Sequence, residues 1–557
     1  MKILLIQPPV RDFYQTSIRT QPIGLAYLAA SLKSNGHEVE ILDCQTETKK
    51  SVSIPSDLSY LKDFYPFNDR SPFKLYSGYY HFGMDWAEIR KKVEDSRADV
   101  FGISSSFTPY HGEALEIAQI IKEWDRRKIV VMGGAHVSCD PEGVLQSPFV
   151  DYVVSGEGEA RFPLLLEQTG KGKTKNIQRI DGIGYRDDGA FRITPLRNFI
   201  QDLDSLPQPV RELLDLDRYR MRKKRSTMII TSRGCPHGCA YCSARLVMGA
   251  SFRTRTPEAI LQEMKECQKQ YGIEIFDIED DNFTFDQKRA KQLMNLMVET
   301  FGERKIELSA MNGISFASLD EELLKLMKRA GFHTVNLSYV STDPSTKERM
   351  RRPKPVTDFD RILEQAEQVG LDVIAYAILG MPGQTIAEMV DTLVYLMGRR
   401  VLIGPSIYYP TPGTSLFERC EKEGILPSSP VQWRSSAFPI ETKEFDRVDL
   451  LTLFRLARVI NFIKGKMDEE ELEEGITWRE LLQTLREKVE TKVEEYRQTW
   501  IDLLLLLASE RSFFSLRKGS GERILVEKEK SSKKVLDYFF EKAWLTPILK
   551  SRSSVAE

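Results

Sequence analysis

The sequence has no long hydrophobic run and few cysteines, and both absences narrow the class of protein. Apolar stretches such as Ile501 to Ala508 fall far short of the ~20 residues that a spanning helix needs, so we expect no membrane span. Seven cysteines are spread thinly along 557 residues, apart from one cluster. A disulfide framework is therefore not expected, and a reducing cytoplasm fits best.

An excess of charge of one sign is also missing. Lysine and arginine number 79 and aspartate and glutamate 81, which gives a formal net charge of −2. No overall attraction to nucleic acid or to anionic lipid is expected, and the basic run from Arg220 to Arg225 indicates a solvated connector. The start, MKILLIQPP, lacks the features of a signal peptide and predicts a buried first strand.

The length favours several domains over a single core, and the first of them is predicted at residues 1–165. Short apolar strands such as Lys2–Gln7 and Val100–Ser104 alternate with helices such as Gly24–Asn35. This alternation predicts an α/β fold with a doubly wound, Rossmann-like parallel sheet. Thr46–Met84 is aromatic and long for a loop, so it is either an inserted lid or a small subdomain.

Three further regions follow along the chain. Turn signals at residues 166–217 predict a β-hairpin and a connector. Residues 218–440 contain a second series of alternating strands and helices, which predicts a partial (β/α)6 barrel with function at the carboxyl ends of its strands. Residues 441–557 are predicted to be a charged, helical C-terminal region, and they carry no motif of their own.

One cysteine cluster follows directly after the predicted strand Met228–Thr231. Cys235, Cys239 and Cys242 are spaced C-x3-C-x2-C. Three thiolates on one loop can hold three irons of a [4Fe-4S] cluster and leave the fourth iron open to an amino and a carboxylate group, as in S-adenosylmethionine. A zinc site or three unrelated thiols are the alternatives, although zinc prefers four ligands and the nearby fourth candidate is His237.

The cysteine spacing resembles that of the radical S-adenosylmethionine (radical SAM) superfamily. Tyr241 stands where that pattern places an aromatic residue near the adenine. Asp280 and Asp281, in the segment Asp280–Phe283, resemble an acidic segment of cobalamin-associated members, which implies that they bind the methionine ammonium through charge-assisted hydrogen bonds. An acidic turn that caps the next helix is the alternative.

Two later segments extend the resemblance and a third departs from it. Gly380 lies in a glycine-containing strand and turn that resembles the one packing against adenine, and the turn Pro412–Thr414 resembles a late turn of the family. Either could be a structural turn only. Val340 stands where the family often has a glutamate. Ribose or carboxylate binding would then pass to other residues nearby, namely Ser338, Ser341, Asp343, Arg351 or Arg352.

The first domain resembles the cobalamin-binding domain that precedes the barrel in one large subclass of the superfamily. The matching turns supply the residues expected to bind cobalamin, namely Ser105, Gly133, Gly134, His136 and Glu157. Small residues at strand ends let a corrin ring or its nucleotide tail approach the backbone, although the same glycines could serve turns only. The sequence has no Asp-x-His-x-x-Gly segment, so His37 and His136 are expected to be structural or tail-contacting rather than axial ligands.

Together these features imply a cobalamin-dependent radical SAM enzyme with three cofactors, a [4Fe-4S] cluster, S-adenosylmethionine and cobalamin. The expected reaction begins with reductive cleavage of S-adenosylmethionine to a 5′-deoxyadenosyl radical and leads to methylation of an unactivated carbon. Cyclisation or rearrangement, a radical enzyme with a vestigial cobalamin domain, and a non-catalytic corrinoid-binding module are the alternatives. The expected partners are a small-molecule, natural-product or lipid substrate and an electron donor such as flavodoxin or ferredoxin.

Overall fold

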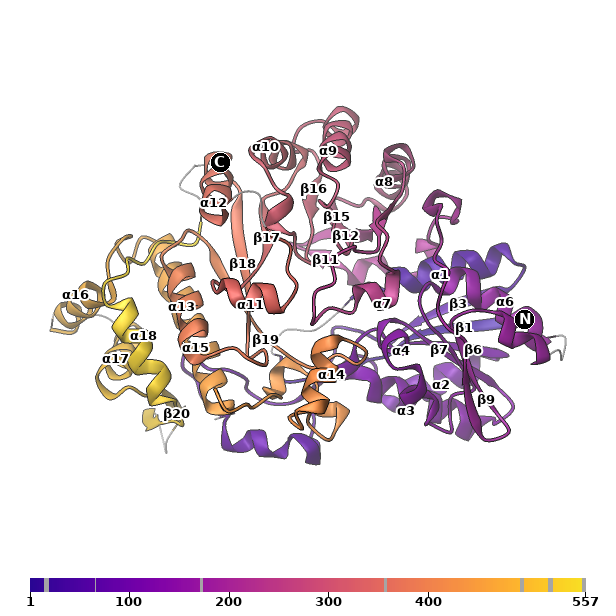
Figure 1. The fold of residues 1–557 in the computed structure, drawn as a ribbon, viewed down its shortest axis with the longest axis horizontal. Helices are drawn as coiled ribbons and strands as arrows, with labels where there is room; N and C mark the ends of the chain where they lie inside the picture. Colours follow the sequence, from indigo (N-terminus) through magenta and orange to yellow (C-terminus); the bar gives the residue numbers. More distant parts are fainter. Residues whose placement is uncertain are drawn as a thin grey trace.

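The computed structural model has three parts in a row (Figure 1). The N-terminal sheet lies at the right of the figure, the barrel at its centre, and the C-terminal helices at its left. The structure describes residues 1–14, 20–65, 67–170, 174–354, 358–490, 495–518 and 524–552.

The first part is built on a seven-stranded sheet in the order β10-β9-β8-β7-β6-β1-β3. Five of its strands are parallel, namely β1 (Lys2–Gln7), β3 (Glu38–Asp43), β6 (Val100–Ser104), β7 (Ile129–Gly133) and β8 (Tyr152–Val154). The hairpin expected in the connector exists, as β9 (Ile183–Asp187) and β10 (Ala190–Ile193), and it pairs with β8. It therefore extends the first sheet.

Helices cover both faces of this sheet, which confirms the doubly wound fold. They are α1 (Ile23–Ser34) and α6 (Gly158–Gly170) on one face, and α2 (Trp86–Ser96) and α3 (His111–Trp124) on the other. Side chains of β1 alternate between the two layers, because Ile3 and Leu5 belong to the first core and Leu4 and Ile6 to the second. A strand covered on both faces needs apolar side chains at successive positions, and Ile3–Ile6 of β1 provide them.

The strand order fixes where a ligand enters. β1 lies between β3 and β6, so the direction of winding reverses between β1 and β6. In open α/β sheets the carboxyl ends of the strands at this switch point border the binding crevice. Gln7 ends β1 and Ser104 ends β6 at this edge.

The aromatic insertion is a small subdomain rather than a lid. Two strands of the insertion, β4 (Lys49–Ser51) and β5 (Tyr80–Phe82), form an antiparallel sheet with β2 (Val10–Asp12), which precedes the insertion in the chain. Tyr65 and Tyr76 are buried in the same hydrophobic cluster as the barrel, and the Tyr60 hydroxyl donates to the Ala437 carbonyl at 2.9 Å. The insertion therefore ties the first part of the chain to the barrel.

The central part contains the six predicted barrel strands in chain order. They are β12 (Lys224–Ile229), β15 (Ile275–Ile278), β16 (Glu307–Ser309), β17 (Thr334–Val340), β18 (Asp372–Leu379) and β19 (Leu402–Ile407). Their parallel ladders join β12 to β15 and β16, and β17 to β18 and β19, while isolated parallel bridges connect the two groups. The partial (β/α)6 barrel is confirmed.

Helices follow these strands on the outside of the barrel. They are α8 (Pro257–Tyr271), α9 (Gln287–Phe301), α10 (Glu321–Ala330), α12 (Phe359–Gln368) and α13 (Ile386–Met397). Asp320 and Asp286 cap α10 and α9 by accepting backbone N–H bonds from Leu323 and Arg289. The capped helices position the loops that precede them at the barrel mouth.

The C-terminal region is mostly helical, as predicted, but it also contains a β-hairpin. Its helices are α15 (Arg447–Asp468), α16 (Trp478–Glu490), α17 (Glu495–Glu510) and α18 (Lys533–Ala543). The sequence did not predict the hairpin, which consists of β20 (Phe514–Lys518) and β21 (Ile524–Lys528) paired antiparallel. In β20, Ser515 and Leu516 are buried while Lys518 is exposed. A short segment that is buried on one side can form a strand as readily as a helix, so the sequence pattern did not distinguish the two.

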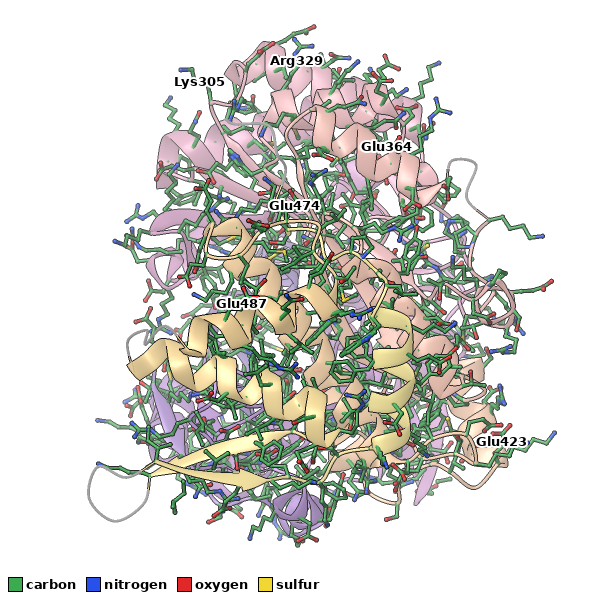
Figure 2. All side chains as sticks on the ribbon, turned by 90° about the vertical axis from the view of Figure 1, so that its left-hand side faces the viewer. Lys305, Arg329, Glu364, Glu423, Glu474 and Glu487 are labelled. Atoms are coloured by element: carbon green, nitrogen blue, oxygen red, sulfur yellow. The ribbon has the colours of Figure 1, made fainter. Side chains whose placement is uncertain are left out.

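Figure 2 faces this C-terminal region, in which Glu487 lies on α16 and Glu474 in the turn that precedes α16. In the described parts of the chain, no helix has both the length and the apolar composition needed to cross a membrane.

Candidate functional site

The cysteine loop is held at both ends by a short hairpin. β13 (Ser232–Arg233) precedes the loop and pairs antiparallel with β14 (Arg253–Thr254), which follows it. Gly234 has φ +84°, a left-handed conformation, and a Cβ there would collide with the Ser251 carbonyl. The loop therefore leaves the strand through a turn that requires glycine.

The three cysteines of the loop are free thiols with polar neighbours. The Asn282 side chain donates to Cys235 Sγ at 3.7 Å, and the Arg352 guanidinium donates to Cys239 Sγ at 3.8 Å. Burial raises the pKa of Cys242 to about 11 and also raises the pKa of Cys235. Metal binding would have to release these protons, and the donors on sulfur would then stabilise the thiolates.

The side chains of the cysteine loop do not converge on a single point in this structure. Among the described residues, no three His, Cys, Asp or Glu side chains lie close enough together to hold one metal ion. The ligands of a four-iron cubane bind different irons and stand farther apart. The donor set, three thiols on one loop, suits a cluster.

Asp280 and Asp281 differ from each other in their surroundings. Asp280 is 2% exposed and accepts from Thr231 N at 2.7 Å and from the Thr231 and Ser232 hydroxyls at 2.5 and 2.6 Å. Its carboxylate anchors the strand that enters the cysteine loop. Asp281 accepts from Gly234 N at 2.9 Å and is exposed, although surrounding protein raises its pKa. Its carboxylate therefore contacts the turn that begins the cysteine loop.

Arg352 links the cysteine loop to the fourth barrel strand. Besides contacting Cys239, it donates to the carbonyl and hydroxyl of Ser338 at 3.1 and 3.0 Å, and it lies next to the Tyr241 hydroxyl. Burial raises the pKa of Tyr241. The structure thus brings together Tyr241, Arg352 and Ser338, three residues singled out from different segments of the sequence.

Val340 marks an irregularity at the carboxyl end of β17. The ladder between β17 and β18 shifts register between Ser338 and Val340, and Val340 has φ +74°. A β-branched residue in this conformation is an outlier, and such outliers concentrate at functional sites. Ser341, predicted to contact the cofactor, is fully buried and donates to Glu388 at 2.9 Å. Asp343 caps the following turn by accepting from Thr346 N at 2.7 Å.

Gly380 lies in a tightly packed turn after β18. Its φ is +84°, and a Cβ there would meet Leu450 at 2.9 Å. Leu450 belongs to α15, so packing against the C-terminal region is one reason for the glycine. The structure places Gly380 at the strand end expected from the sequence and adds this second constraint.

A cavity of about 380 Å³ lies between the first domain and the barrel. It is lined from the first domain by Ser104–Ser106, Gly133, Gly134 and Glu157, and from the barrel by Met228, Ile230, Met248 and Glu279. Met228 and Ile230 precede the cysteine loop, and Met248 follows it. The cavity therefore opens beside the segments that carry the three cysteines.

The predicted turns meet at this cavity. Gly134 has φ +113°, and a Cβ there would lie 2.7 Å from the Ser105 carbonyl, so the two turns are in close contact. The Ser105 hydroxyl shares a hydrogen bond of 3.1 Å with His111, and Ser105 N donates to Gly133 O at 2.7 Å. Ser104 and Ser106 share a hydroxyl contact of 3.0 Å and remain open to solvent or ligand.

His136 lies beneath the turns and does not line the cavity. It is 4% exposed, shares a hydrogen bond of 3.1 Å with Thr108, and its ring lies 4.3 Å from that of His111. Burial lowers the pKa of His136 to about 4. These contacts fit the structural role considered for His136.

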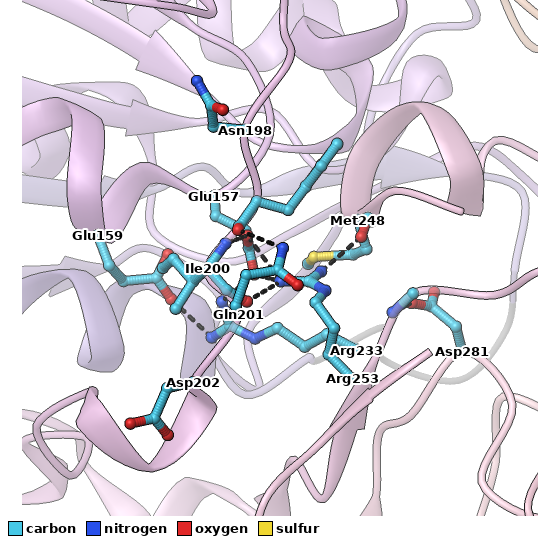
Figure 3. A network of polar contacts seen from close by, with 12 residues as sticks. Glu157, Glu159, Asn198, Ile200, Gln201, Asp202, Arg233, Met248, Arg253 and Asp281 are labelled. Carbon is cyan, nitrogen blue, oxygen red and sulfur yellow. Dashed lines mark hydrogen bonds and ion pairs between the residues drawn. The ribbon is translucent and has the colours of Figure 1, made fainter. Parts of the chain in front are cut away.

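Glu157 is part of a buried ion-pair network that crosses the domain boundary (Figure 3). Its carboxylate accepts from Arg233 and Arg253 at 2.9 Å each and from Ile200 N at 2.7 Å. Glu159 pairs with Arg233 at 2.7 Å. Glu157 was predicted from its turn, but neither arginine carries a sequence signal for this contact. The network fixes the hairpin of the cysteine loop to the first domain.

Two further residues near the site were missed by sequence reasoning. Glu279 lines the cavity, accepts from Asn312 at 2.5 Å, and has a pKa raised to about 7 by burial and by Asp277. Cys139, one of the four cysteines outside the loop, lies beside Ser243 and close to Cys242. Glu279 directly precedes Asp280 in the sequence, but nothing in that position indicates that it lines the cavity, and Cys139 comes from a segment distant from the cysteine loop.

Family comparisons agree with this two-part site. The family model described as Radical SAM superfamily matches residues 229–396, and the model described as B12 binding domain matches residues 78–166. The first match covers the cysteine loop and the barrel strands from β15 to β18, and the second covers the turns at Ser104–Ser106, Gly133–Gly134 and Glu157.

Individual proteins similar to this chain cover most of its length. An uncharacterized methyltransferase of Pyrococcus horikoshii is 29% identical over 84% of this chain and 94% of its own length. The cytidylyl-2-hydroxyethylphosphonate methyltransferase of Streptomyces wedmorensis is 26% identical over 76% of this chain and 82% of its own length. The structure of the radical S-adenosylmethionine methyltransferase TsrM from Kitasatospora setae, with cobalamin and a [4Fe-4S] cluster bound, shares the fold, with a TM-score of 0.58 and 18% identity over 78% of this chain and 84% of that one. This chain belongs to the radical SAM superfamily and carries a B12-binding domain in front of its barrel.

Proposed function

We propose that this protein is a cobalamin-dependent radical SAM methyltransferase that methylates an unactivated carbon. One observation carries the proposal: the cavity at the switch point of the first sheet is also walled by the residues on either side of the cysteine loop. A ligand held by the first domain would therefore face the barrel mouth, where a substrate could meet both cofactors.

For the cluster, we assign Cys235, Cys239 and Cys242 as ligands. They are free thiols on one loop, and Asn282 and Arg352 already donate toward two of the sulfurs. Hydrogen bonds to sulfur and burial are the means by which a protein tunes such a cluster.

For S-adenosylmethionine, we assign different roles to the groups around the cysteine loop. Asp281, which is exposed beside the cysteine loop, would accept from the methionine ammonium, while Asp280 holds Thr231 and Ser232 in position. Tyr241 supplies an aromatic face, and Arg352 with Ser338 supplies donors for the carboxylate or ribose. Ser341 and Gly380 would then act by shaping the strand ends.

For cobalamin, the first domain offers the turns at Ser104–Ser106 and Gly133–Gly134. Their small side chains let the ligand approach the backbone, and the Gly134 turn leaves no room for a side chain on the Ser105 side. Glu157 contributes by holding Arg233 and Arg253, and His136 by supporting the turn from below.

When the three cofactors are bound, the reduced cluster and S-adenosylmethionine supply a carbon-centred radical and cobalamin carries the methyl group. The chain's own part is binding, orientation and exclusion of quenching reactions. The buried ion pairs of Glu157 and Glu159 with Arg233 and Arg253 would hold the two cofactor sites in a fixed position relative to each other.

Methylation is favoured over cyclisation or rearrangement by the relatives. Two relatives that this chain matches over more than four fifths of their length are both methyltransferases by name. A vestigial first domain or a non-catalytic corrinoid-binding module would leave the cavity or the cysteine loop without a role. The substrate that we propose is a small molecule, the electron donor is a small redox protein such as flavodoxin or ferredoxin, and the compartment is the cytoplasm.

Isotope labelling tests the proposal without knowledge of the substrate. The full chain, reconstituted anaerobically with iron, sulfide and cobalamin, is incubated with dithionite and with S-adenosylmethionine whose methyl group is deuterated. We expect 5′-deoxyadenosine in the mixture and the deuterated methyl group on the extracted cobalamin. Formation of 5′-deoxyadenosine without any labelled cobalamin would contradict the methyltransferase assignment.

A further inference from the structure

Gln21 bridges the first domain and the first strand of the barrel. It lies just before α1, and its side-chain oxygen accepts from the Thr227 hydroxyl and from Met228 N, each at 2.8 Å. Met228 pairs in register with Asp277 on one side of β12. On the other side, the described partner strand β11 (Arg220–Met221) pairs only as far as Lys224 and Arg225. Gln21 therefore supplies a hydrogen-bond acceptor for the backbone N–H of Met228 on the side of β12 where β11 no longer pairs.

These contacts fix which way the Gln21 amide points. A backbone N–H can only donate, so the amide oxygen must face Met228 and the NH2 group must lie at the opposite end. That nitrogen has no hydrogen-bond partner among the described residues, and the side chain is 4% exposed. Gln21 also lines the cavity between the domains. A buried donor without an acceptor is destabilising unless a ligand supplies one.

Two other glutamines in the same wall differ from Gln21. The Gln7 nitrogen donates to the Thr20 carbonyl at 2.5 Å, and the Gln45 nitrogen donates to the Pro8 carbonyl at 3.2 Å. Both amides hold the strand-end loops together and have acceptors within the protein. Of these three cavity glutamines, Gln21 is the one whose donor is left for a ligand.

We propose that Gln21 donates a hydrogen bond to a neutral oxygen acceptor on the rim of the ligand in this cavity. The inference rests on the proposed function, in which the ligand is cobalamin, because the corrin rim carries carboxamide groups whose oxygens match a neutral NH2 donor. A single amide would then bind the ligand and the Met228 backbone at once. Gln21 is thus a positioning residue that sets the corrin relative to the strand entering the cysteine loop.

Ligand variants test this contact through charge rather than through activity. The full chain, prepared free of cobalamin, is titrated anaerobically with hydroxocobalamin and with its isomeric monocarboxylic acids, each having one rim amide replaced by a carboxylate. Absorbance of the corrin reports the binding. The native protein should bind all of them comparably, because amides and carboxylates both present an oxygen to the Gln21 donor.

Gln21→Glu should change this pattern for one isomer. An oxygen still faces Thr227 and Met228, so the barrel edge stays capped, and a rim amide can rotate to donate to the carboxylate. A rim carboxylate at the contacted position cannot, so that isomer should bind about tenfold more weakly or worse, relative to hydroxocobalamin. Gln21→Met, which has no donor, should weaken hydroxocobalamin itself by about tenfold.

Gln45→Glu is the matched control, because its nitrogen end faces Pro8, and it should shift all the isomers by a common factor. A Gln21→Glu protein that binds every isomer in the native ratio would overturn the inference. Failure of the native protein to take up hydroxocobalamin at all would instead overturn the proposed function.

Discussion

Replacing Glu157 by glutamine would remove the charge that holds the two domains together beside the cysteine loop. The Glu157 side chain is fully buried, and those of Arg233 and Arg253 are 5% and 3% exposed. Removing one partner of a buried ion pair costs about 3–5 kcal/mol, because a buried charge is left uncompensated. Glu159 still pairs with Arg233, and the Ile200 and Met248 carbonyls still accept from Arg253, so we expect the lower end of this range.

A loss of ~3 kcal/mol lowers the unfolding midpoint by about 6–12 °C if the cooperative unit has about 150–250 residues. Thermal unfolding of the cofactor-free chain, followed by circular dichroism, measures this shift. The control is Glu321→Gln, since the pair of Glu321 with Lys325 is about half exposed and should contribute no measurable shift (side-chain exposures 47% and 57%). A Glu157→Gln midpoint that moves no more than the control midpoint would refute the reasoning. The variant should also retain less iron after reconstitution, because Arg233 adjoins Gly234 and Cys235.

Three further predictions concern the cofactor sites and pH. Replacing Cys235, Cys239 and Cys242 together by alanine should abolish iron binding after anaerobic reconstitution, whereas Cys420→Ala, at a buried cysteine outside the loop, should leave the iron content unchanged. Asp281→Asn should weaken S-adenosylmethionine binding by about tenfold or more with the cluster intact, whereas Asp280→Asn should lower cluster retention itself, because Asp280 holds Thr231 and Ser232; equal effects in iron analysis and in equilibrium binding would contradict this division. Burial lowers the pKa of His136 to about 4, against about 6.5 in the unfolded chain, so between these pH values the unfolded chain binds one more proton than the folded chain. The free energy of unfolding should therefore be unaffected by His136 above pH 6.5 and should fall as the pH drops toward 4. His136→Gln should flatten this part of a plot of unfolding free energy against pH, and an unchanged slope would rule out His136 as its source.

Local patterns in the sequence were sufficient to predict the sheet, the barrel and the cysteine loop. Strand Val100–Ser104, for example, has the predicted bounds, because a short apolar run of this kind has few other folds available. The contact of Ser105 with Gly133 and Gly134 could also be expected from the sequence, because these residues follow neighbouring parallel strands that end at the same edge of the sheet.

The contacts that assign roles to single residues could not be predicted in this way. Glu157 meets Arg253 across 96 residues, and Gln21 meets Met228 across 207. No spacing rule connects such positions, because the approach depends on how the two domains pack. Asp280 looked equivalent to Asp281 in sequence, yet its three donors make it a buried anchor. The hairpin in the C-terminal region was missed because its strands are short and follow long helices.

Metal analysis of one anaerobic preparation tests the central claim most directly. The full chain is reconstituted with iron and sulfide, incubated with hydroxocobalamin, desalted, and assayed for iron, cobalt and cleavage of S-adenosylmethionine. The account predicts about four irons and one cobalt per chain, together with 5′-deoxyadenosine after reduction. A fully iron-loaded protein that forms 5′-deoxyadenosine but takes up no cobalt would contradict the claim that both cofactors act at this site.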